Sequence, residues 1–168
     1  MIPLKQRLTD LEDSLELNYR KLSRFQKDLD VSAHTPSQFE LTEEINNKIL
    51  PRIRVCELEY WGILRQFSPK CDIPDLDAQS AIRTITQDLQ GVRWQAMSPE
   101  VLDPKVLPLL ESILQKLDEP GTAAAAKAKF AVNVIPGILT YEFEFDTESI
   151  LRRAFKPLKQ LFGEAAKK

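Results

Sequence analysis

The sequence has little of what enzymes use for covalent or metal chemistry. Its 168 residues include two cysteines, one histidine and five glycines. Cys56 and Cys71 form no Cys-x-x-Cys pair, and a dyad of His34 with Cys56 is conceivable but has no third group to orient it. No glycine-rich phosphate-binding motif occurs. We therefore expect a protein that is not an enzyme, and we predict no catalytic residue, no cofactor and no metal ligand.

The sequence also lacks a strong charge of one sign and a long apolar run. It has 23 basic and 25 acidic residues, a formal net charge of -2, so we expect no nucleic-acid partner. No apolar stretch approaches the roughly 20 residues that cross a bilayer. The first seven residues are charged too early for a secretory signal. With only two cysteines, these features predict a cytoplasmic protein.

The clearest positive pattern is a heptad repeat in the first thirty residues. Apolar side chains recur every seven positions, at Leu8, Leu15, Leu22 and Leu29. The interleaved register holds Leu4, Leu11, Asn18 and Phe25. This spacing predicts one long coiled-coil-like helix, in which the polar Asn18 marks the register of the seam.

A second long helix is predicted to begin at Thr35-Pro36, which has the residues of a helix start. Apolar residues at helical spacing continue to Phe67, and Pro51 inside this run predicts a kink. Because each helix has an apolar stripe that it cannot bury alone, we predict an antiparallel helical hairpin over residues 1–68. A homodimer through leftover apolar surface is an open alternative.

The rest of the chain divides into three predicted parts. Residues 75–119 form a helical segment. Residues 120–129 are an alanine-rich linker, for which a flexible tether and a nascent helix are both open. Residues 130–168 form a strand pair followed by an amphipathic helix. The predicted fold class is therefore mainly α with a small β element.

The strand pair is predicted from a period of two on both sides of Pro136-Gly137. The residues assigned to strands are Val132, Val134, Tyr141, Phe143 and Phe145. Glu142 and Glu144 would then lie on the outer face of an edge strand. Other acidic pairs, Glu43-Glu44 and Glu57 with Glu59, fall on predicted helices and are interpreted as solvated faces.

The last helix carries four basic residues opposite its apolar stripe, at Arg152, Arg153, Lys156 and Lys159. A basic amphipathic helix can lie on an anionic membrane or dock in a partner's groove. More commonly such a helix covers a core with its apolar face and exposes the basic one.

The segment from Phe130 to Ile150 (FAVNVIPGILTYEFEFDTESI) resembles a stretch in cyanobacterial conflict-system proteins, where a strand pair with an Ile-Pro turn follows a helical region. The first sixty-odd residues also resemble the helical effector-associated modules of those systems. There such modules are joined to caspase-like, TIR or NACHT-type NTPase domains. The resemblance implies adaptor work, in which helical contacts bring an effector to a sensor.

Together these patterns predict a non-catalytic protein–protein interaction module, an adaptor or assembly subunit of a bacterial signalling or defence complex. The alternative is a peripheral membrane protein that docks through its basic C-terminal helix. The residues predicted to bind partners are Leu8, Leu15, Asn18, Leu22, Arg152, Arg153, Lys156 and Lys159.

Overall fold

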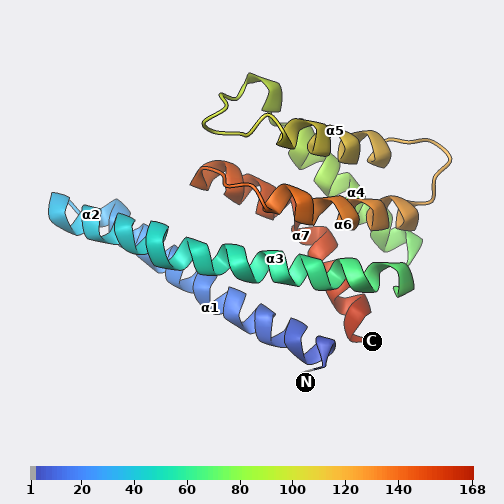
Figure 1. The fold of residues 1–168 in the computed structure, drawn as a ribbon, viewed down its shortest axis with the longest axis horizontal. Coiled ribbons are helices and arrows are strands. Elements are labelled where there is room, and N and C mark those ends of the chain that lie inside the picture. Colours follow the sequence, from blue (N-terminus) through green and yellow to red (C-terminus); the bar gives the residue numbers. More distant parts are fainter. Residues whose placement is uncertain (1–2) are drawn as a thin grey trace. The chain divides into compact units, whose positions relative to one another are not determined.

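The computed structural model describes residues 3–168, apart from the side chain of Phe145. All regular elements in this part of the chain are helical (Figure 1). In chain order they are α1 (Leu4–Val31), α2 (Thr35–Glu44), a π-helical turn (Ile45–Ile49), α3 (Leu50–Phe67), a 3₁₀ turn (Ser68–Lys70), α4 (Asp75–Gln90), a second 3₁₀ turn (Trp94–Ala96), α5 (Val106–Leu117), α6 (Ala124–Leu139) and α7 (Phe145–Lys167). Met1 and Ile2, which the predicted hairpin included, lie outside the described residues.

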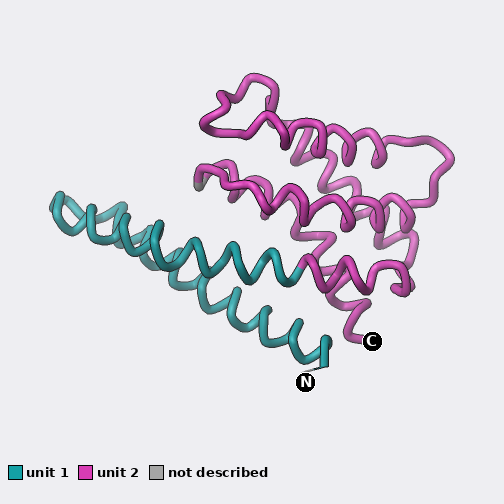
Figure 2. Tube along the Cα trace, viewed as in Figure 1, with its two compact units in different colours: residues 1–60 teal, residues 61–168 magenta. Residues whose placement is uncertain are grey.

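The chain divides into two compact units (Figure 2). Unit 1 is residues 1–60 and unit 2 is residues 61–168, so the boundary falls inside α3. Each unit has its own buried apolar side chains.

In unit 1, α1 runs beside the continuous helical stretch of α2, the π-helical turn and α3 (Figure 1). The buried residues of α1 are Leu8, Leu11, Leu15, Asn18 and Leu22. On the opposing stretch they include Ile45, Ile49, Leu50 and Ile53. Each such apolar side chain stabilises the fold by roughly 1.5–3 kcal/mol when fully buried.

The π-helical turn has a cause in the spacing of these apolar residues. Leu41, Ile45, Ile49 and Ile53 follow one another at intervals of four. Four residues rotate an α-helix by about 400°, so three such intervals turn the apolar stripe by about 120° away from its partner. A π-turn contains one extra residue and compensates for about that rotation. Leu50 accordingly donates its N–H to the Ile45 carbonyl, five residues back.

Pro51 is the second residue after this turn. A proline inside a helix lacks the N–H for the carbonyl four residues back and crowds that carbonyl. The predicted response was a kink at Pro51. The structure instead has the π-helical turn at Ile45–Ile49. The carbonyl that Pro51 cannot reach, that of Asn47, belongs to this widened turn.

In unit 2, α4 contacts both α6 and α7, and α5 packs against α6. Trp61 is buried, and its ring lies edge-on to Phe155 with centroids 6.4 Å apart. Trp94 is also buried, and its indole N–H donates a 2.9 Å hydrogen bond to the Leu89 carbonyl at the end of α4. The polar edge of Trp94 is therefore satisfied inside the core.

The predicted C-terminal strand pair is wrong, because no strand occurs among the described residues. Val132 and Val134 lie in α6, and Phe145 is the first residue of α7. Tyr141 and Phe143 lie in the short connection between these helices, where Phe143 is buried without a strand partner. The fold class is therefore all-helical rather than α with a β element.

Small residues explain why α6 is a helix. Its buried positions include Ala124, Ala128, Ala131, Ile135 and Ile138, spaced by four and three. That is helical periodicity, and three of these five residues are alanine. The alanine-rich stretch over 120–129 thus contains the first turns of α6, and only 120–123 precede the helix. Gly121 supplies the positive φ of 80° in that preceding turn.

Candidate functional site

The leucine seam that the heptad repeat predicted as a binding surface is buried within unit 1. Leu8 is 0 % exposed, and Leu15 and Leu22 are buried too. Asn18 is buried, and its Nδ2 donates a 2.7 Å hydrogen bond to the Ser14 carbonyl of its own helix. The amide is thus satisfied locally, and these four residues are not available to an outside partner in this conformation.

The contacts that align the two long helices are instead tyrosine–glutamate pairs. The Tyr19 hydroxyl on α1 donates to Oε1 of Glu57 on α3, at 2.6 Å. The Tyr60 hydroxyl on α3 donates to Oε1 of Glu12 on α1, also at 2.6 Å. Glu57 is only 5 % exposed, so its interpretation as part of a solvated face is wrong. A buried carboxylate needs such a donor, and each pair can form in only one alignment of the helices.

A third link is the ion pair between Arg7 and Glu59. The guanidinium donates twice to the carboxylate, Nε to Oε1 at 2.6 Å and Nη2 to Oε2 at 2.8 Å. The hydrogen bond from Arg7 holds the pKa of the Glu59 carboxyl below its usual range. Glu59 is therefore also engaged with α1, although both partners are substantially solvated. Apolar periodicity places Tyr60 on the inner stripe of α3 but does not find its partner, because Glu12, like the carboxylates Glu57 and Glu59, is polar.

Most of the exposed large apolar side chains belong to unit 1. Seven large apolar side chains are exposed among the described residues, and six of them belong to unit 1. The six are Leu4, Leu17, Val31, Phe39, Val55 and Leu58. The seventh, Leu76, is at the start of α4. Scattered exposed leucines are ordinary, so an aligned subset is what would indicate a binding surface.

Three of the six are aligned. Val55 and Leu58 are three residues apart on the side of α3 that faces away from Ile53 and Tyr60. The extra residue of the π-helical turn rotates Phe39 of α2 onto the same side. Phe39 and Val55 are each 66 % exposed and Leu58 is 36 % exposed. We call Phe39, Pro51, Val55 and Leu58 the outer stripe; Pro51 is half-buried and lies between the other members.

Two of the four basic residues predicted on the last helix are exposed, and two are partly buried. Arg153 and Lys156 are exposed on α7, whereas Arg152 and Lys159 are partly buried. Arg152 lies 3.6 Å from the buried Glu148 one turn earlier. The apolar face of α7 is packed inside unit 2, where Leu151, Ala154, Phe155, Leu158 and Phe162 are essentially inaccessible.

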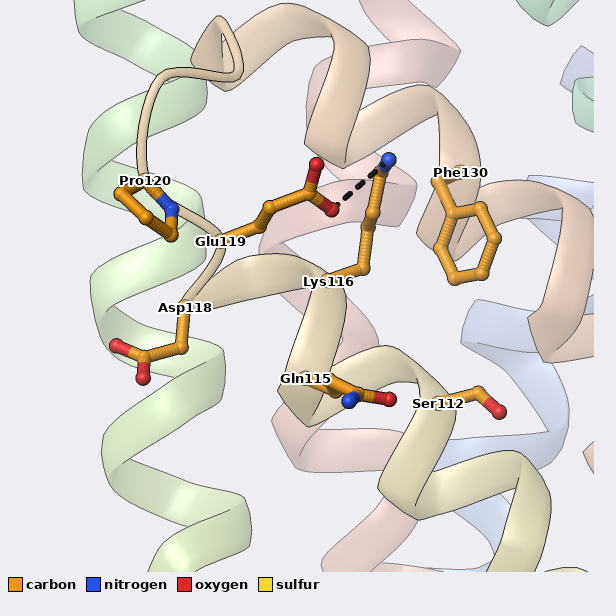
Figure 3. A pocket seen from close by; sticks show the side chains of 7 residues that line it. All are labelled: Ser112, Gln115, Lys116, Asp118, Glu119, Pro120 and Phe130. Carbon is orange, nitrogen blue, oxygen red and sulfur yellow. Dashed lines mark ion pairs between the residues drawn. The ribbon is translucent and has the colours of Figure 1, made fainter.

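Unit 2 also has a shallow cavity of about 550 Å³ where α5 ends and α6 passes (Figure 3). It is lined by Ser112, Gln115, Lys116, Asp118, Glu119, Pro120 and Phe130. Lys116 forms a 3.1 Å ion pair with Glu119 and lies 5.6 Å from the centre of the Phe130 ring. A hydrogen bond from Lys116 lowers the pKa of Glu119. Because Lys116 and Glu119 neutralise each other, we assign this cavity no ligand.

The residues considered for their reactivity belong to different elements of the structure. His34 is exposed at the start of α2, and Cys56 is partly buried on α3. Cys71 is buried in unit 2, and burial raises the pKa of its thiol. In the described part of the chain, no group of three or more His, Cys, Asp or Glu residues is placed to hold a metal ion.

No protein-family model matches the chain, and no curated protein and no solved structure is significantly similar to it. Among the described residues, no helix combines the length and the apolar character that crossing a membrane requires.

Proposed function

We propose that the chain is a non-catalytic protein–protein interaction module, an adaptor or assembly subunit that binds through the outer stripe of unit 1. The observation that supports this proposal is the exposure of Phe39, Val55 and Leu58 on one side of the α2–α3 stretch. An aligned set of large apolar side chains in water is costly, and it is characteristic of surfaces that a partner covers.

The heptad pattern predicted that the leucine seam binds the partner. Because the seam is buried within unit 1, we assign partner binding to the outer stripe instead. Pro51, Val55 and Leu58 have the i, i+4, i+7 spacing of a helix that presents anchors to a groove, which is one of the common modes of peptide and helix recognition. We expect Phe39 to contribute most to the binding free energy, because aromatic side chains are common among the residues that dominate such contacts.

The resemblance of the first sixty-odd residues to effector-associated modules supports placing this work in a bacterial signalling or defence complex. The contribution of Phe130–Ile150 to that resemblance depended on a strand pair, and those residues are mostly helical. The proposal therefore depends on unit 1.

The membrane alternative has less support. An amphipathic helix binds a bilayer by inserting its apolar face between lipids. In α7 that face packs inside unit 2, so Arg153 and Lys156 would have only electrostatic attraction to offer.

Site-specific photo-crosslinking in the native cells tests the proposal. A photoreactive amino acid replaces Val55 in the full chain, and a matched control carries it at the exposed Gln87 of α4. We expect a discrete crosslinked product from position 55 and none from position 87. No crosslink from either position, or the same products from both, would overturn the proposal.

A further inference from the structure

The charges beside the outer stripe are separated along its length. Glu40 and Glu43 are exposed near Phe39, in the N-terminal half of the stripe. Arg52 is exposed near Val55, in the C-terminal half. The exposed charges beside the stripe in these two halves are therefore two carboxylates near Phe39 and one guanidinium near Val55.

Lys48 lies near the midpoint of the stripe. It forms an ion pair of 3.2 Å with Glu44 on the same helical stretch. Phe39 is nine residues before Lys48, and Leu58 is ten residues after it. Phe39 and Leu58 are thus at nearly equal separations from one central position, and so are Glu43 and Arg52.

This arrangement is complementary to itself when one copy is reversed. In an antiparallel pair centred on Lys48, Phe39 of one copy falls between Val55 and Leu58 of the other. Glu43 of one copy then falls next to Arg52 of the other. A parallel pair would place Glu43 against Glu43 and Arg52 against Arg52, which is repulsive. The charge pattern therefore selects the antiparallel orientation.

We propose that a second copy of this chain is the partner of the outer stripe, bound as an antiparallel, two-fold symmetric pair. Such an interface is isologous, so each contact occurs twice. The proposal rests on the proposed function, because it names the partner of the same surface. Covering Phe39 and Val55 supplies the attraction, and the rim charges set the orientation.

Sedimentation of the full chain over low to high micromolar concentration tests the pairing. We expect a reversible monomer–dimer equilibrium that weakens as salt rises, because solvated rim charges are screened. Val55→Glu places a carboxylate inside the contact and should raise the dissociation constant at least about tenfold. Leu17→Glu is the matched control. Leu17 is 53 % exposed on the side of α1 opposite its seam, and this variant should dimerise like the parent.

A charge exchange tests the orientation. Glu43→Arg and Arg52→Glu should each weaken the dimer, because each places like charges together across the interface. The double variant exchanges the two charges and should return the dissociation constant to within a few-fold of the parent. Circular dichroism of every variant establishes that the helices are intact. A double variant weaker than both single variants would overturn the antiparallel register.

The two proposals can fail separately. If the chain sediments as a monomer at every concentration while position 55 crosslinks to a different protein, self-pairing is excluded and the interaction module stands. If position 55 crosslinks to nothing and the chain is monomeric, both are excluded. Equal weakening by Val55→Glu and Leu17→Glu would also overturn self-pairing through the outer stripe.

Discussion

The hydroxyl of Tyr60 on α3 donates a 2.6 Å hydrogen bond to the Glu12 carboxylate on α1. Tyr19 and Glu57 repeat this contact with the helices exchanged, since here α1 supplies the tyrosine. Two tyrosine–glutamate hydrogen bonds thus join the two long helices, and the tyrosine belongs to α3 in one pair and to α1 in the other. A shift of α1 along α3 would break both bonds, so the pairs fix the alignment of unit 1.

Replacing Tyr60 by phenylalanine should lower the free energy of unfolding by about 1–3 kcal/mol, because Glu12 loses a donor while the ring stays in place. Urea unfolding followed by circular dichroism measures the change. Tyr141→Phe, in the connection between α6 and α7, is the control and should change stability by less than about 0.5 kcal/mol. Equal stability of the parent and Tyr60→Phe would show that the bond does not contribute.

Stability should decline in alkaline solution through the same tyrosine. Burial, then the hydrogen bond to Glu12, raises the pKa of Tyr60 above its ordinary value of about 10. Above that pH the unfolded chain releases the tyrosine proton and the folded chain retains it, so the free energy of unfolding falls as pH rises. Urea unfolding of the parent between about pH 9 and pH 11 should therefore show a steeper loss than that of Tyr60→Phe. Parallel curves would contradict the assignment.

Asn18→Leu should leave the oligomeric state unchanged and keep or modestly raise stability, by up to about 1 kcal/mol. Its amide donates only to Ser14 of its own helix among the hydrogen bonds described, and a leucine would add apolar volume to the seam. Thermal unfolding and sedimentation measure the two quantities. A change of oligomeric state would mean that the seam lies between two copies.

Deleting Asn47 should leave unit 1 folded with little loss of stability. Without the extra residue the π-helical turn becomes an ordinary α-turn, and Leu41 keeps its orientation toward α1, because eleven residues of α-helix rotate it by about as much as twelve residues that include the turn. Deletion of Cys56 is the contrast, because it lies in α3 outside the turn and rotates Glu57 and Tyr60 by about 100° relative to Ile53. That variant should be strongly destabilised, and comparable melting temperatures for the two deletions would contradict the role given to the turn.

Co-sedimentation with vesicles rich in anionic lipid tests the membrane alternative. At physiological salt the full chain should stay in the supernatant, because the apolar side chains of α7 are packed inside unit 2. A variant with Arg153 and Lys156 changed to glutamine identifies any electrostatic part of the binding. Strong binding by the parent, lost in this variant, would favour the membrane function instead.

The long helices could be predicted from the sequence, because their buried leucines and isoleucines are large and recur at helical spacing. The stretch after Lys129 could not be predicted in the same way. Alternation of Val132, Val134, Tyr141 and Phe143 matches a strand, yet the periodicity that decides the fold includes Ala128 and Ala131. A pattern judged from large apolar residues misses a helix whose inner face is partly alanine.

The candidate surface was harder to predict than the fold. The heptad pattern is the most regular apolar pattern of the sequence, and its central leucines Leu8, Leu11, Leu15 and Leu22 are buried rather than exposed to a partner. Phe39 fits the apolar spacing of the second helix only when no residue is inserted, and the π-helical turn moves it to the outside. A one-residue insertion leaves no composition signal. Its trace is the interval of four among Leu41, Ile45, Ile49 and Ile53.

The alanines of α6 reverse the usual rule for mutational damage in a core. Truncation is what most harms a position filled by leucine or phenylalanine, because it leaves a void. Ala128 and Ala131 are fully buried and have almost nothing to remove. Damage there comes from enlargement, since any bigger side chain must displace neighbouring helices. Natural variation at these two positions should therefore be limited to the smallest residues, whereas the leucine positions elsewhere can exchange among large apolar ones.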